Sequence, residues 1–135
     1  MRRGFFRLTR NPSGEWASRR IAARRLARKR KCRIRPEKLV KYLLNLQHPK
    51  GAAKAKFFLA GGFSREKPEV LEAALIRHYQ ENEPTELFED QFRETRIVID
   101  APMLVPDGRL PMVRTVWRIP LGEQISEFVT AHPLD

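Results

Sequence analysis

The chain has 135 residues and a formal net charge of +11, from 27 Lys and Arg against 16 Asp and Glu. Its single cysteine, Cys32, excludes an intrachain disulfide and the usual Cys/His zinc spacing, so a reducing, cytoplasmic setting is expected. No apolar run approaches the roughly 20 residues that cross a membrane, and no membrane association is expected.

The excess of positive charge lies in the first part of the chain. Residues 1–35 hold 14 Lys and Arg and one acid, Glu15, whereas residues 36–135 hold 13 basic and 15 acidic residues. The sequence therefore predicts a flexible basic arm over 1–35 and a compact domain over 36–135. The arm has three interpretations: a nucleic-acid-binding arm, an organellar targeting segment, or an unstructured extension. In the first, its phosphate-binding side chains are Arg19, Arg20, Arg24, Arg25 and Arg28.

The first half of the domain has the pattern of helices. Pro36 followed by Glu37 is typical of a helix start, and the apolar spacing over 39–44 predicts an amphipathic helix that ends at the following His-Pro-Lys-Gly turn. A second short helix is predicted over 52–60 and a third from Pro68. We interpret His78, on the apolar stripe of the third helix, as a residue at the edge of the core.

The second half alternates apolar and polar residues, as strands do. Three such segments, near 95–105, 109–119 and 124–132, are joined by short turns, which predicts an antiparallel meander. The fold class is therefore α+β, with two or three N-terminal helices packed on a C-terminal sheet of three to four strands.

Turn lengths predict the pairing of these strands. The first loop pairs Ile97 with Trp117 and Asp100 with Arg114, and the second pairs Thr115 with Phe128 and Val113 with Thr130. This register places Thr130 on the core side of the sheet.

The opposite face then carries three arginines. Arg96 and Arg118 face each other directly, which is unfavourable unless an anion lies between them, and Arg114 faces Asp100. This face either contacts nucleic-acid phosphates or is a solvated surface with Asp100 and Glu127 as counterions.

The segment "HPKGAAKAKFF", residues 48–58, is the candidate phosphate-handling site. It gathers an imidazole, His48, with the ammonium groups of Lys54 and Lys56. An imidazole suits proton transfer because its ordinary pKa is near 6.5. The alternative is a turn and an amphipathic helix in which His48 is bonded to the backbone and the lysines are solvated.

Four motifs in order, "KLVKYLL" (38–44), "HPKGAAKAKFF" (48–58), "VRTVW" (113–117) and "FVTAHP" (128–133), resemble an uncharacterised bacterial family of domains of unknown function. The resemblance covers 36–134. The chain departs from it at His132, where the family pattern has tyrosine. The layout is also similar to the barnase–EndoU–colicin–RelE group of ribonuclease folds.

The second resemblance implies a metal-independent endoribonuclease without cofactor or metal, in which the ribose 2′-OH attacks the phosphorus, and its substrate is RNA. The implied roles are proton transfer by His48 and His132, phosphate binding by Lys54 with Lys56 or Arg114, and a hydrogen bond to a phosphate oxygen from Thr130 or Thr115. In a toxin of that group, a small acidic antitoxin-like protein is the expected partner. The alternatives are a non-catalytic nucleic-acid-binding protein that acts through its basic arm, and a protein-interaction module.

Overall fold

The computed structural model describes residues 5–7, by their backbone alone, and 31–134. The arm arginines predicted to bind nucleic acid lie outside the described residues: Arg19, Arg20, Arg24, Arg25 and Arg28. The three interpretations of the arm therefore stay predictions.

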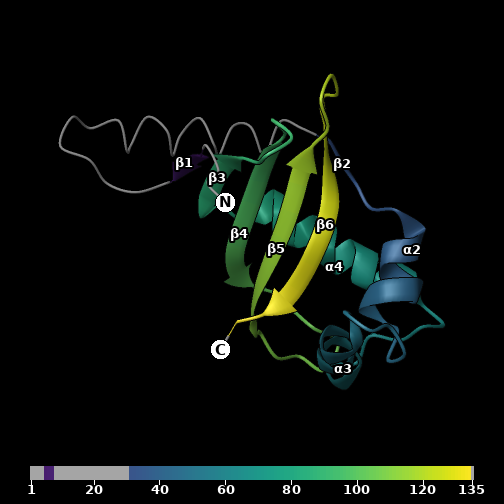
Figure 1. Cartoon of the computed structure of the whole chain (residues 1–135). Helices are drawn as coiled ribbons and strands as arrows, with labels where there is room; N and C mark the ends of the chain where they lie inside the picture. The colour runs from purple at the N-terminus through teal and green to yellow at the C-terminus, as the bar shows by residue number, and fades with distance from the viewer. Residues whose placement is uncertain (1–4, 8–30, 135) are drawn as a thin grey trace.

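The described part of the chain has the predicted α+β fold (Figure 1). One mixed sheet holds its strands in the order β1-β3-β4-β5-β6-β2, with only β2 and β6 parallel. The strands are β1 (Phe5–Arg7), β2 (Lys31–Arg33), β3 (Glu86–Glu89), β4 (Thr95–Pro102), β5 (Met112–Ile119) and β6 (Ile125–Pro133).

The helices lie near the three positions that the sequence predicts. α4 crosses behind the sheet, whereas α2 and α3 lie beside β6 (Figure 1). Pro36 and Pro68 occupy the first turns of α2 and α4, where proline costs no hydrogen bond. The bounds are α2 (Pro36–Lys38), continuing directly into the π-helix η1 (Leu39–Leu43), then α3 (Ala52–Ala60) and α4 (Pro68–Glu81).

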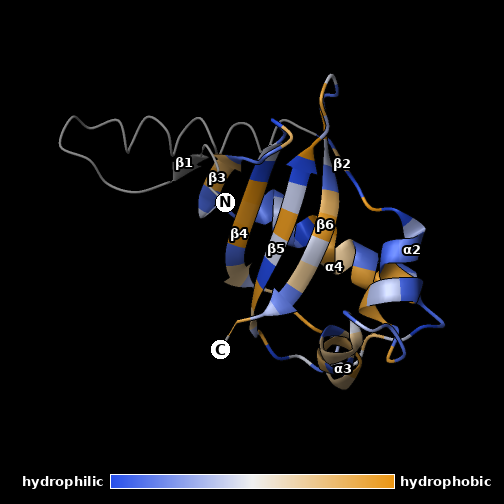
Figure 2. Ribbon diagram, viewed as in Figure 1, coloured by the Kyte–Doolittle hydropathy of each residue, from blue (hydrophilic) through white to orange (hydrophobic). Residues whose placement is uncertain are grey.

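Large aromatic rings fill the space between α4 and the sheet. The rings of Tyr79 and Trp117 have centroids 4.7 Å apart, and those of Trp117 and Phe128 lie 5.3 Å apart. Hydrophobic and hydrophilic bands alternate along β5 (Figure 2), with Val113, Thr115 and Trp117 fully buried. The alternation is that of a strand with one face on the core.

His78 belongs to this core, in agreement with its interpretation as a structural residue. Its Nε2 lies 3.1 Å from the Ala101 carbonyl and 3.0 Å from that of Val113, so Nε2 carries the hydrogen. Its Nδ1 accepts from the Thr115 hydroxyl at 3.0 Å, and that hydroxyl accepts from the Trp117 indole at 3.0 Å. The network satisfies both ring nitrogens within a buried layer.

We expect this histidine to make the fold sensitive to mild acid. Burial lowers the pKa of His78 below its usual value, although its bonds to Ala101 and Val113 and the charge of Asp100 oppose the shift. Since the unfolded chain then binds the proton more readily, the free energy of unfolding should fall as the pH drops below about 6.5. An NMR titration of the His78 ring checks this; a pKa at or above 6.5 would contradict it.

The predicted register is right for the first hairpin. Ile97 pairs with Trp117, and Asp100 pairs with Arg114. Arg96 also faces Arg118 as expected.

The predicted pairs of the second hairpin, Thr115 with Phe128 and Val113 with Thr130, are wrong. Phe128 pairs with Trp117, two residues from its predicted partner, and a β-bulge between Trp117 and Val116 then shifts the ladder so that Val116 pairs with Thr130. The inserted residue reverses the facing of the residues after it, because side chains alternate along a strand. Thr130 therefore lies on the outer face of the sheet and is half-buried.

The folded part of the chain starts earlier than the predicted boundary at residue 36. β2 pairs with β6 over Ile125–Glu127, and Ile34 is buried in the core. Strand β3, which pairs with β4, also lies outside the three predicted strand segments.

Candidate functional site

A half-buried tyrosine joins two of the predicted site residues. The Tyr42 hydroxyl of η1 lies 2.5 Å from Lys54 Nζ of α3 and 3.1 Å from Thr130 Oγ1 of β6. Lys54 Nζ also donates to Thr130 Oγ1 at 2.9 Å. Three segments far apart in sequence thus bring an ammonium, a phenol and a hydroxyl into mutual contact.

A second lysine completes the group. Lys38 Nζ donates to the Val129 carbonyl at 3.0 Å and lies 5.4 Å from the centroid of the Tyr42 ring. That carbonyl is accessible because β2 pairs with β6 only over Ile125–Glu127, so the rest of the β6 edge faces the helices. We call Lys38, Tyr42, Lys54 and Thr130 the lysine–tyrosine cluster.

The cluster is electropositive. Among residues 31–134, no carboxylate lies within ion-pair distance of Lys38 or Lys54. Burial alone raises the pKa of the Tyr42 phenol, but hydrogen bonds from Lys54 and Thr130 and the charges of both lysines outweigh it, so the pKa lies below its usual value near 10. The cluster therefore favours anions, including its own phenolate.

His48 borders the cluster but is held by the backbone. Its ring meets the Tyr42 ring edge to face, with centroids 5.0 Å apart. Its Nδ1 accepts from the backbone N–H groups of Lys50 and Gly51, each at 3.0 Å. The remaining nitrogen, Nε2, then carries the hydrogen and is a hydrogen-bond donor rather than a base.

Gly51 allows the helices to approach this closely. A Cβ at Gly51 would lie 2.8 Å from Tyr42 Cδ1 and 2.9 Å from the Tyr42 carbonyl oxygen. Any other residue would push η1 and its phenol away from α3.

We expect His48 to act mainly through this turn. The variant His48→Ala loses both backbone hydrogen bonds and should lower the free energy of unfolding by about 1–2 kcal/mol. In His48→Asn a short carbonyl can still accept from the same N–H groups and should recover most of that loss. Chemical denaturation of both variants measures the difference; equal destabilisation would contradict the proposed turn role.

The arginines predicted to contact phosphates are paired within the chain instead. Arg96 Nε lies 2.8 Å from Asp90 Oδ2, and Arg114 makes two bonds to Asp100 at 2.7 and 2.8 Å. Asp100 is one of the two counterions that the alternative interpretation of this face names, whereas Asp90 was not among them.

Arg118 is held in the same way. It contacts Glu127 at 2.7 Å and Glu94 at 2.8 Å. The directly opposed Arg96 and Arg118 are thus compensated by carboxylates of the protein itself.

The structure does not bring the two other candidates into the cluster. Lys56 is exposed on α3, two residues beyond Lys54, a spacing that points the two side chains to different sides of the helix. His132 lies two residues beyond Thr130 on β6, pairs with Arg114, and donates from Nδ1 to the Pro133 carbonyl at 3.1 Å.

Sequence reasoning missed Lys38 and Tyr42. Both lie in the "KLVKYLL" segment, whose apolar stripe predicts a helix but no site. The available signal was a lysine and a tyrosine four residues apart, a spacing that places two side chains on one helix face.

The chain belongs to a family described as Domain of unknown function (DUF6883), which matches residues 25–135. Searches of curated proteins and of solved structures found no match. Within the described residues, no helix is long and apolar enough to span a membrane, and no group of three His, Cys, Asp or Glu side chains is arranged to hold a metal ion.

Proposed function

We propose that the lysine–tyrosine cluster binds a phosphate of RNA and cleaves the RNA strand at that phosphate by transphosphorylation. The observation that carries the proposal is the contact of Tyr42 with Lys54 and Thr130, in a site where no described carboxylate neutralises the lysines. Two ammonium groups beside a phenol of lowered pKa supply both charge stabilisation and a proton acceptor.

Each cluster residue has a defined part in the reaction. The Tyr42 phenolate takes the proton of the ribose 2′-OH, and the 2′ oxygen attacks the phosphorus. Lys38 and Lys54 stabilise the added negative charge. The Thr130 hydroxyl has one hydrogen, which it turns from the Tyr42 oxygen to a phosphate oxygen once Tyr42 carries the proton. The bond to the 5′ oxygen breaks, and that oxygen takes a proton from an ammonium group of the cluster. The products are a 2′,3′-cyclic phosphate and a 5′-hydroxyl.

The arrangement changes the roles expected from sequence. Lys54 and Thr130 keep their predicted functions, but the base is Tyr42 instead of His48, whose Nδ1 already accepts two backbone hydrogen bonds. His48 supports the site through its edge-to-face contact with the Tyr42 ring.

The test is cleavage of a defined single-stranded RNA by the full chain in the presence of a chelator. We expect cyclic phosphate ends, and we expect Lys54→Ala to lower kcat/KM by about 10²–10³-fold, the usual cost of removing one charge-stabilising donor.

Lys41→Ala is the matched control. Lys41 is an exposed lysine next to Tyr42 on η1, and it lies outside the cluster. This variant should cleave like the wild type. Intact RNA, or equal loss of activity in both variants, would reject the proposal. If the chain binds RNA but does not cleave it, and Lys54→Ala binds as tightly as the wild type, the result would instead favour a nucleic-acid-binding protein that acts through its basic arm.

A further inference from the structure

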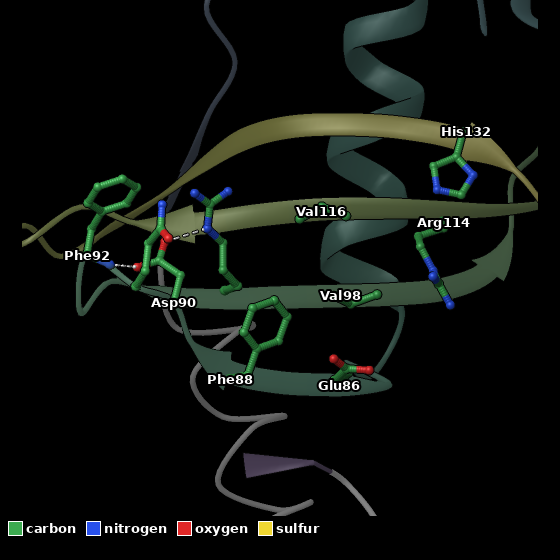
Figure 3. Close-up of a pocket in the computed structure, with 10 residues that line it drawn as sticks. Glu86, Phe88, Asp90, Phe92, Val98, Arg114, Val116 and His132 are labelled. Carbon is green, nitrogen blue, oxygen red and sulfur yellow. Dashed lines mark hydrogen bonds and ion pairs between the residues drawn. The ribbon is translucent and has the colours of Figure 1, made fainter. Parts of the chain in front are cut away.

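A pocket on the outer face of the sheet lies apart from the lysine–tyrosine cluster. Its volume is about 430 Å³, within the range of small-ligand sites. Figure 3 shows Val98 and Val116 on β4 and β5, with the rings of Phe88 and Phe92 toward one end. Arg114 and His132 lie at the other end.

The charge of this pocket does not suit a phosphate. Arg96 is bonded to Asp90, which also lines the pocket, and Arg114 is bonded to Asp100. A paired guanidinium still offers a flat face to an aromatic ring. Apolar walls, aromatic rings and neutralised arginines therefore fit an uncharged, planar, polar ring.

Phe92 is the most exposed of the apolar residues that line the pocket. Phe92 is 64% exposed, so its ring is available for a ligand to stack on. Its backbone N–H is held by Asp90 Oδ1 at 2.8 Å, so the turn that presents the ring is fixed by bonds that do not involve the ring.

The pocket and the cluster share one face of the sheet. Val116 lines the pocket and pairs with Thr130 of the cluster, and His132 follows Thr130 by two residues. Two residues along a strand span about 6.6 Å, a separation that one nucleotide can bridge.

We propose that this pocket holds an unpaired base of single-stranded RNA whose neighbouring phosphate lies at the cluster. The inference rests on the proposed function for the identity of the bound strand. It also restricts the substrate, because a base in a duplex is stacked and cannot enter the pocket.

The experiment measures binding of the full chain to a 2′-O-methyl RNA strand, which lacks the attacking hydroxyl, and to an abasic strand of equal length. The wild type should bind the base-bearing strand more tightly. Phe92→Ala should weaken that binding by about 5- to 150-fold, the range for one stacked base, and leave the abasic strand unaffected. Leu110→Ala, which removes another exposed apolar side chain, should change neither affinity.

Equal affinity of the wild type for both strands, or unchanged binding by Phe92→Ala, would overturn the pocket assignment. The two proposals fail separately. Base-dependent binding without any cleavage would reject the nuclease function and support the pocket assignment. Cleavage of RNA together with unchanged binding by Phe92→Ala would support the nuclease function and reject the pocket assignment.

Discussion

Replacing Tyr42 by phenylalanine should lower RNA cleavage by about 10²–10⁴-fold, the usual contribution of a positioned general base. The substitution removes one oxygen and keeps the ring that meets His48. Lys54 retains its 2.9 Å bond to Thr130, so the ammonium stays in place and the loss falls on proton transfer. Single-turnover rates separate this step from RNA binding, which should change little.

The pH dependence provides a second signature of the same group. Because the pKa of the Tyr42 phenol is lowered, the wild-type rate should rise with pH and level off below the usual tyrosine value near 10. Tyr79→Phe is the matched control, since it also removes a tyrosine hydroxyl, one that donates to Ser126 at 2.8 Å inside the core. If Tyr42→Phe cleaves RNA at the wild-type rate, or if Tyr79→Phe loses as much of the cleavage rate, Tyr42 has no part in the mechanism.

Glu127→Gln should be among the most destabilising single substitutions in the domain. The Glu127 side chain is 4% exposed and pairs with Arg33, Arg35 and Arg118 at 3.0, 2.9 and 2.7 Å. Removing its charge leaves three cations close together without their shared partner. Breaking a buried pair typically costs about 3–5 kcal/mol, and we expect the lower end because the arginines are partly exposed and can be rehydrated.

Glu123→Gln is the control for this prediction. Glu123 pairs with the same Arg33 at 3.2 Å, but its side chain is 42% exposed, so its loss should cost at most about 1 kcal/mol. Urea denaturation of the two variants measures the difference in the free energy of unfolding. Equal stabilities would show that the buried pairs do not hold β2 to β6.

The elements that obey local rules were predictable from sequence. Pro36 and Pro68 mark helix starts through their fixed φ, and the short loop at 106–108 fixes the pairing of Ile97 with Trp117. The second hairpin was not predictable in detail, because the bulge on β6 opposite Val116 and Trp117 depends on the packing of a whole sheet and leaves no turn signal.

Features that depend on distant partners were not predictable from sequence. β2 lies in an arginine-rich run that has no strand pattern, and it forms because β6 supplies the ladder and Glu127 supplies the counter-charge. Only part of the lysine–tyrosine cluster was predictable, for the same reason. Lys54 and Thr130 stood out by residue type, whereas Tyr42 becomes interesting only when α3 and β6 meet it.

The protonation of Tyr42 is the most direct test of the central claim, because it depends on the cluster and not on any choice of RNA. The chain has only two tyrosines, so specific labelling of the phenol carbon gives two NMR signals to titrate. We predict that Tyr42 titrates below its usual value near 10 and that Lys54→Met raises its pKa while Lys41→Met does not. A Tyr42 pKa at or above 10 that does not change in Lys54→Met would contradict the claim that the lysines of the cluster lower the pKa of this phenol.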